Sequence, residues 1–233
     1  VYNCQKWTSP WGWLWYSRPA TATGGFEEKK TPVKITDIKQ QIKRQGRYSI
    51  FVDDKYSFSL SENALMKSGI RIGREYDQAE LDELQDTAVL DKAYMRSLDL
   101  LSRRARSEWE LRDYLKRKDY GPEVIKKIIG RLGEAGYIDD YKFAVSWVES
   151  RHLLKNISSR KLWQELKQKR IPDEVINQVL EEDETDELET LKNLVAKKRS
   201  QSRYQDDQKL MAFLRRQGYR YDDVKTAMAE PDS

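Results

Sequence analysis

Basic side chains recur in three groups along the chain and are the residues best suited to binding a partner. Each group stands near the junction between two predicted helices, and one further pair ends a helix of the second group. The residues are Arg103, Arg104 and Arg106; then Arg151, Lys155, Arg160 and Lys161, with Lys169 and Arg170; and then Lys197, Lys198, Arg199 and Arg203. Arginine and lysine bind phosphates and carboxylates through charge-assisted hydrogen bonds, so the pattern predicts a basic edge that binds an anionic partner. The alternative is a set of solvated faces and favourable charges at helix C-termini.

Polar residues elsewhere form no catalytic or metal-binding pattern. The chain has one histidine, His152, and one cysteine, Cys4, which argues against histidine-based metal chemistry and excludes a disulfide bond within the chain. It has no glycine-rich phosphate loop followed by Lys and Ser or Thr. The neighbouring carboxylates Asp139 and Asp140 fit a helix N-cap better than a general acid and base. The sequence therefore predicts a protein that is not an enzyme and needs no cofactor or metal ion.

The helices that position the basic groups follow a unit that is clearest from Ser107 onward. A helix is predicted to begin there, because Ser107 and Glu110 have the spacing of a capping box, in which each side chain satisfies a free amide of the first turn. The turn from Asp119 to Pro122 ends that helix, and Pro122 begins another. The second helix carries an apolar stripe with helical spacing, formed by Val124, Ile125, Ile128, Ile129 and Leu132.

The same unit returns 51 residues later, where Ser107 falls on Ser158 and Leu115 falls on Leu166. A looser third copy, with one inserted residue, runs from Leu210 to Met228. An amphipathic helix precedes each copy, so the unit is three helices in about fifty residues. The sequence predicts a mainly α fold, made of tandem three-helix, helix-turn-helix-like repeats in an elongated array with a small N-terminal element that contains a β-hairpin.

The hairpin is predicted from alternation of apolar and polar residues over residues 48–52 and 56–60, around the turn Asp53-Asp54. An earlier strand over residues 33–42 is also expected, although Ile38 and Ile42 fall out of phase with Val33 and Ile35. The predicted divisions are an extension at 1–32, the hairpin and helix element at 33–86, and three-helix repeats at 87–136, 137–185 and 186–233.

Residues 1–32 differ from the rest in composition, with Trp7, Trp11, Trp13 and Trp15 followed by a stretch rich in Thr, Ala and Gly. Their apolar run is too short and too aromatic for the core of a signal peptide. We interpret this segment as a disordered or non-native extension. The alternative is an aromatic peptide that docks on a partner.

The overall composition favours small stacked units over one large core, because 35% of the residues are charged and only 38% are hydrophobic. No run approaches the roughly 20 apolar residues that a membrane-spanning helix needs, so no membrane association is expected. The single cysteine is typical of a reducing compartment, and a cytoplasmic location is expected.

Three motifs point to a known family. They are Arg106-Ser107 with Glu110-Leu111 and Leu115; Gly136-Tyr137-Ile138-Asp139-Asp140 followed by Phe143, Ala144, Trp147 and Arg151; and Glu165-Leu166 with Lys169 and Ile171. With the hairpin and the third repeat, the sequence from about Val33 to Ala229 resembles the RecX family, whose members regulate the RecA recombinase. Asn156 and Arg170 stand where such proteins usually have glycine. The turn at Arg170 is expected to differ, because a left-handed backbone costs an arginine roughly 1 kcal/mol or more.

We expect a monomer, and the resemblance implies a non-enzymatic modulator of DNA repair and the SOS response. Such a protein binds RecA, lies along the groove of the RecA–DNA filament, and restrains strand exchange, ATP hydrolysis and co-protease activity; it could also bind single- or double-stranded DNA directly. The alternative is a direct DNA-binding protein that reads DNA with the third helix of a repeat, which Glu174, Glu181 and Glu182 disfavour. Trp109 and Trp163 could stack on bases, but their helical spacing favours packing.

Overall fold

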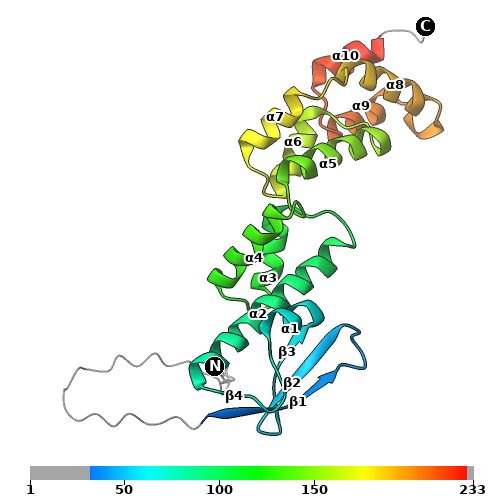
Figure 1. Cartoon of the computed structure of the whole chain (residues 1–233). Coiled ribbons are helices and arrows are strands. Elements are labelled where there is room, and N and C mark those ends of the chain that lie inside the picture. The colour runs from blue at the N-terminus through cyan, green and yellow to red at the C-terminus, as the bar shows by residue number, and fades with distance from the viewer. Residues whose placement is uncertain (1–31, 230–233) are drawn as a thin grey trace, which may run out of the picture.

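The structure, a computed structural model, describes residues 32–229 and has an elongated shape, with a small sheet at one end and successive groups of helices beyond it (Figure 1). This mainly α architecture confirms the fold class predicted from the sequence. The predicted extension lies outside the described residues except for Pro32. Within residues 32–229, no helix combines the length and the apolar character that crossing a membrane requires.

The N-terminal sheet has four antiparallel strands in the order β3-β2-β1-β4. The strands are β1 (Val33–Gln40), β2 (Arg47–Val52), β3 (Lys55–Ser61) and β4 (Glu75–Tyr76). The predicted hairpin is confirmed, and its turn residues Asp53 and Asp54 have φ angles of 47° and 62°, as a two-residue type I′ turn requires. The earlier strand ends at Gln40, and a shift in register between Ile35 and Asp37 places one extra residue in β1. This bulge explains why Ile38 falls out of phase with Ile35.

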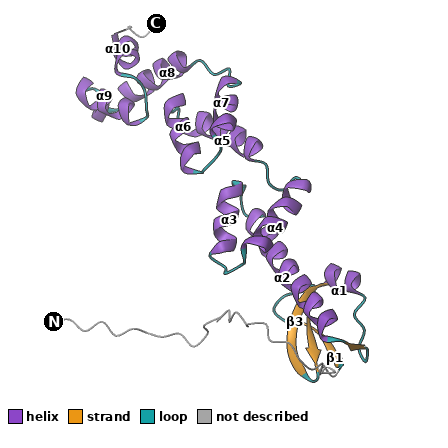
Figure 2. Ribbon diagram, turned by 90° about the vertical axis from the view of Figure 1, so that its left-hand side faces the viewer, coloured by secondary structure: helices purple, strands orange, loops and turns teal. Residues whose placement is uncertain are grey.

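Helix α2 (Gln78–Leu101) connects the sheet to the first repeat (Figure 2). It is continuous across residues 86 and 87, where the sequence suggested a division. Leu81 and Ala88 pack in the core of the sheet element, whereas Ala93 packs in the core of the first repeat. Asp91 accepts hydrogen bonds from Ser61 and from the buried Arg47, which ties the helix to the sheet. The short helix α1 (Glu62–Ser68) covers the same side.

The remaining helices form three similar units, each with a separate apolar core. Repeat 1 is the end of α2 with α3 (Glu108–Lys116) and α4 (Pro122–Glu134); repeat 2 is α5 (Asp140–Leu154), α6 (Ser159–Gln168) and α7 (Asp173–Glu181); and repeat 3 is α8 (Glu187–Arg199), a 3-10 turn (Ser202–Tyr204), α9 (Asp207–Arg216) and α10 (Tyr221–Ala229). The equivalent leucines Leu115, Leu166 and Leu214 are each fully buried in the middle helix. The repeated apolar pattern thus produces repeated packing.

Two local expectations were wrong. Ser107 caps α3 by accepting from the amide of Glu110, but the Glu110 carboxylate does not return to Ser107, because it binds cations instead. The turn at Arg170 does not differ from its equivalents, since Arg170 has a φ of 59° and the equivalent Asp119 and Gly218 have φ angles of 62° and 99°. Each middle helix therefore ends in a left-handed residue at this position, whatever its side chain.

Candidate partner-binding surface

The middle helices of the repeats meet end to end. The Ser107 hydroxyl, at the N-terminus of α3, donates to the carbonyl of Lys169 at the end of α6 over 2.9 Å. The Ser158 hydroxyl, at the N-terminus of α6, donates to the carbonyl of Gln217 at the end of α9 over 3.3 Å. Each contact joins the positive end of one helix dipole to the negative end of the next. The three middle helices therefore form one end-to-end series, which sets the spacing of the basic residues beside them.

A carboxylate from the following repeat completes each junction. Asp140, the first residue of α5, accepts from the Glu108 amide over 2.8 Å, and Glu187, the first residue of α8, accepts from the Ser159 amide over 3.1 Å. Burial raises the pKa of Asp140 above its ordinary value. Both carboxylates satisfy a free amide at the start of a middle helix, so the two junctions are built alike.

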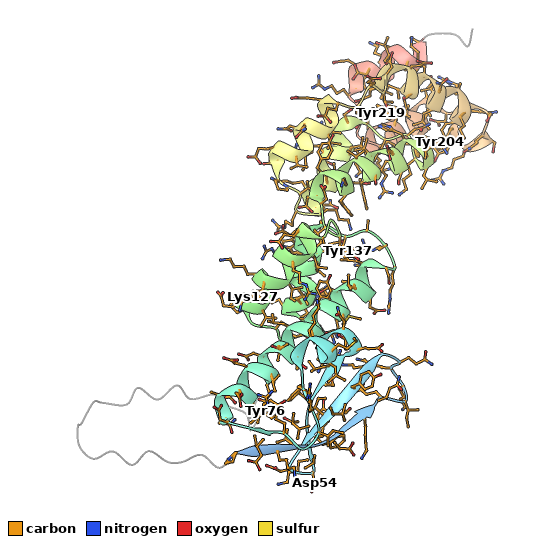
Figure 3. All side chains as sticks on the ribbon, viewed as in Figure 1. Asp54, Tyr76, Lys127, Tyr137, Tyr204 and Tyr219 are labelled. Atoms are coloured by element: carbon orange, nitrogen blue, oxygen red, sulfur yellow. The ribbon has the colours of Figure 1, made fainter. Side chains whose placement is uncertain are left out.

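Tyr219 adds a buried contact between repeats 2 and 3, at the boundary seen in Figure 3. Its hydroxyl donates to the carbonyl of Asn156 over 3.2 Å. Burial, and then the negative charge of Glu187, raise the pKa of Tyr219 well above its ordinary value. The phenol therefore stays neutral and acts as a hydrogen-bond donor in this junction.

At the junction of repeats 1 and 2, the predicted basic residues are largely bound within the protein. Glu110 accepts from Arg104 over 3.0 Å and from Lys169 over 2.7 Å. Burial opposes ionisation of Glu110, but the hydrogen bonds from Arg104 and Lys169 outweigh it and lower the pKa of the carboxyl. The Arg170 guanidinium lies 5.8 Å from the ring of Trp109, which is 44% exposed. The packing predicted for Trp109 is therefore wrong, whereas Trp163 does pack partly against the core of repeat 2.

The other predicted residues of the first two groups differ in their surroundings. Arg103 pairs with Asp99 over 3.0 Å on the surface. Arg106 is half-buried, and burial followed by the positive charge of Arg104 lowers its pKa. Arg151 binds Glu165 over 2.5 Å and lies 4.2 Å from the ring of Trp147. Lys155 is exposed at the end of α5.

Two residues of the third group lie beside an aromatic ring of repeat 3. Lys198 and Arg203 lie 5.4 Å and 5.7 Å from the ring centre of Tyr204. Arg199 pairs with Asp207 over 2.8 Å, and Lys197 is exposed. The ring holds two cations close together on the surface of this repeat.

Arg160 and Lys161 lie beside cations that are distant in the sequence. They line a hollow of about 500 Å³ together with Arg215, Arg216 and Arg220. Arg215 and Arg216 are recognisable in the sequence as the charged end of a helix, but sequence reasoning missed Arg220. The local signal is Gly218, whose φ of 99° marks a turn two residues before Arg220.

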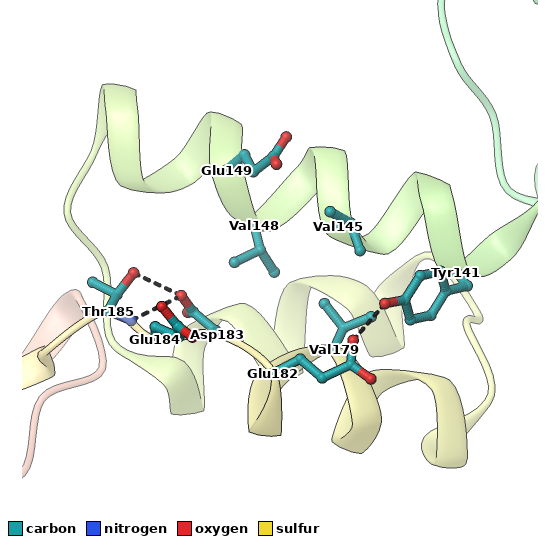
Figure 4. Close-up of a pocket in the computed structure, with 9 residues that line it drawn as sticks. All are labelled: Tyr141, Val145, Val148, Glu149, Val179, Glu182, Asp183, Glu184 and Thr185. Atoms are coloured by element: carbon teal, nitrogen blue, oxygen red, sulfur yellow. Dashed lines mark hydrogen bonds between the residues drawn. The ribbon is translucent and has the colours of Figure 1, made fainter.

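A second hollow, between α5 and the segment after α7, has the opposite charge (Figure 4). Tyr141 donates to Glu182, and Asp183 accepts from the amide and hydroxyl of Thr185. These bonds hold the segment that leads into repeat 3. Among residues 32–229, no three His, Cys, Asp or Glu side chains gather as metal ligands would. The exposed residues Asp173, Glu174 and Glu181 of α7 add further negative charge, which disfavours α7 as a DNA-reading helix.

Comparison with known proteins matches four successive parts of the chain to one family. Residues 33–77 match the Regulatory protein RecX N-terminal domain. The first, second and third three-helix domains of RecX match residues 93–132, 139–180 and 184–228. "Regulatory protein RecX" of Bacillus subtilis (strain 168) is 34% identical over 199 residues, which are 83% of this chain and 75% of that protein. "Regulatory protein RecX" of Listeria monocytogenes serotype 4a (strain HCC23) is 32% identical over 206 residues, 86% of this chain and 77% of that protein.

Two solved structures resemble this one. A crystal structure of regulatory protein RecX, 29% identical, matches with a TM-score of 0.64 over 85% of this chain and all of that chain. A crystal structure of RecX from Lactobacillus salivarius, 26% identical, matches with a TM-score of 0.52 over 60% of this chain and 94% of that chain.

Proposed function

This chain belongs to the RecX family of regulatory proteins, and from that premise we propose that it binds RecA and the groove of the RecA–DNA filament. There it inhibits the recombinase, ATPase and co-protease activities of RecA without being an enzyme itself. The observation that carries this proposal is the end-to-end series of three middle helices in an elongated array, with basic residues at both junctions and unpaired cations at the second.

A repeat array suits a filament for a physical reason. The groove of a helical filament offers the same contacts at regular intervals, and a chain of similar units can make several weak contacts along it at once. Linked contacts of this kind raise the overall affinity without any single tight site. The exposed cations supply attraction to phosphates or carboxylates along the groove.

The test is the rate of ATP hydrolysis by the cognate RecA on single-stranded DNA while the full chain is titrated in. Inhibition at amounts well below one molecule per RecA monomer supports binding along the filament. A matched titration without RecA measures how much of this protein binds to the DNA alone. With that binding accounted for, an unchanged rate of ATP hydrolysis at equimolar amounts would refute the proposal.

A further inference from the structure

A hollow of about 460 Å³ lies between α2 and the turn that joins β1 to β2. Arg44 reaches it from the turn, and Lys92 and Arg96 reach it from α2. None of these three cations forms an ion pair with a carboxylate of residues 32–229. Asp99 also lines the hollow, but it pairs with Arg103 over 3.0 Å. The hollow therefore gathers positive charge that the described part of the chain does not neutralise.

These cations repel one another. Lys92 and Arg96 are four residues apart on α2, so their side chains are neighbours on the helix surface, where like charges destabilise the helix. Burial, and then the positive charge of Arg96, lower the pKa of Lys92. The buried carboxylate of Asp91 cannot compensate, because it is already bound to Arg47 over 3.3 Å. An anion bound in the hollow would relieve this repulsion.

Backbone and side-chain contacts hold the walls of this hollow in place. The amide of Glu62, at the start of α1, donates to the carbonyl of Gly46 over 2.9 Å, which ties the turn to α1. The next residue, Arg47, donates to Asp91 over 3.3 Å, which ties the end of the turn to α2. Cations that are already in position lose little conformational freedom when an anion binds. The site is therefore preorganised for a ligand.

A second hollow, of about 980 Å³, continues from the first, because Gly46, Ser61 and Met95 line both. Met66 and Tyr94 also line the second hollow, and the side chains of Met66 and Met95 are 78% and 43% exposed. Methionine adapts its shape to a ligand and makes favourable contacts with aromatic rings. The two hollows thus place an apolar surface beside the cations, which suits a ligand with a compact anionic group and a flat ring.

We propose that the two joined hollows bind a nucleoside diphosphate or triphosphate, with its phosphates at the three cations and its base against Met95. Arginine and lysine bind phosphate oxygens through charge-assisted hydrogen bonds. A diphosphate or triphosphate carries several negative charges within one group. A nucleic acid strand and an acidic peptide distribute their charges along a chain, one to a residue, so neither concentrates them in a single hollow.

The site joins two parts of the molecule. Arg44 belongs to the sheet element, whereas Arg96 donates to the hydroxyl of Tyr120 in repeat 1 over 3.2 Å. A polyphosphate bound by both arginines would hold the sheet element against repeat 1. The nucleotide is thus an effector and takes part in no reaction. The inference goes beyond the proposed function, because this binding needs neither RecA nor DNA.

The test uses the full chain and ATP labelled on its ribose with an N-methylanthraniloyl group, and binding is followed by fluorescence anisotropy. The double variant Arg44→Gln with Lys92→Gln removes two phosphate contacts and should weaken binding by about tenfold or more. Arg96 is kept, because its hydrogen bond to Tyr120 contributes to repeat 1. If the unchanged protein leaves the anisotropy of the labelled ATP unaltered, the proposal is overturned.

The matched control is the double variant Lys126→Gln with Lys127→Gln, which removes the same charge from exposed positions of α4. It should bind the labelled ATP like the unchanged protein. Circular dichroism of both double variants checks that helix content is retained. An equal loss of affinity in the two would overturn the site, because it would show that only net charge matters.

The contact with the base is tested separately at Met95. Met95→Ala should weaken binding of the labelled ATP by about threefold or more, since it removes the contact between the sulfur and the ring. The affinity for inorganic tripolyphosphate, measured by displacement of the labelled ATP, should stay the same, because this anion has no base. An equal loss for both ligands, or no loss for either, would overturn the placement of the base.

Competitors identify the ligand class. Unlabelled ATP should displace the labelled ATP more effectively than tripolyphosphate, which lacks the base, and more effectively than AMP, which has one phosphate. Oligothymidylate or polyglutamate that displaces it as well as ATP does, at equal charge concentration, would overturn the assignment to a compact polyphosphate. Neither RecA nor DNA takes part in the direct binding measurement, so its failure and the failure of the ATPase test can be told apart.

Discussion

The substitution Glu110→Gln should reveal how strongly repeats 1 and 2 are joined. The change keeps the shape of the side chain but removes the charge that Arg104 and Lys169 share. The Glu110 side chain is 14% exposed, while those of Arg104 and Lys169 are 45% and 25% exposed. A hydrogen bond to a charged group contributes about 1.5–3 kcal/mol, and the partial exposure of both cations places this loss near the lower end. We expect the free energy of unfolding to fall by about 2 kcal/mol.

The effect should depend on pH in a defined direction. The hydrogen bonds from the two cations give Glu110 a lower pKa in the folded protein than in the unfolded chain. A lowered carboxyl pKa stabilises the fold above the unfolded value, which is about 4.3 for glutamate. That contribution is lost as the pH falls through the folded pKa. The difference in the free energy of unfolding between Glu110→Gln and the unchanged protein should therefore be largest near neutral pH and should shrink in acid.

The assay is urea unfolding followed by tryptophan fluorescence. The ring of Trp147 lies 5.0 Å from the ammonium group of Lys169, so its emission should report on this junction. The matched control is Glu108→Gln on the same helix, which removes a surface pair with Arg112 in which both side chains are 43% exposed. Such pairs contribute about 0.5 kcal/mol or less. If the two variants lose the same stability, or if the Glu110→Gln loss persists unchanged in acid, the junction is not held by this carboxylate.

Three further predictions concern the basic edge and the turns. Arg103→Glu should weaken binding to the RecA–DNA filament while helix content, measured by circular dichroism, stays the same, because Arg103 is exposed and pairs only with Asp99 on the surface. Normal folding with unchanged binding would remove this residue from the interface. Arg170→Gly should raise the free energy of unfolding in urea by up to about 1 kcal/mol, because glycine adopts a φ of 59° without strain, less whatever the contact with Trp109 contributes. The reciprocal change Gly218→Ala should lower the free energy of unfolding by more than about 1 kcal/mol. Gly218 has a φ of +99°, and an added Cβ would clash with the Ser158 hydroxyl. A gain in stability would contradict the close approach of repeats 2 and 3.

Local patterns were reliable where the physical cause was local. Apolar residues at helical spacing predict a buried stripe because the helix itself brings them to one face. The repetition of that stripe therefore predicted three similar units, and in the structure the core of each unit contains one of the equivalent leucines Leu115, Leu166 and Leu214. Alternation predicted the hairpin for the same reason. It could not reveal the bulge near Ile35, because one extra residue in a strand changes the phase of the pattern without leaving another signal.

The sequence by itself thus determined the helices, their grouping into three similar units and the recurrence of basic residues between them. Only the tertiary structure decided which cations are neutralised and which remain open. Lys169 binds Glu110 across 59 positions of sequence, and Arg160 and Arg220 line one hollow only because α6 and α9 stack end to end. Charges interact through space, and the distance between two charged groups depends on how whole helices are placed, so no local pattern could distinguish the paired junction from the open one.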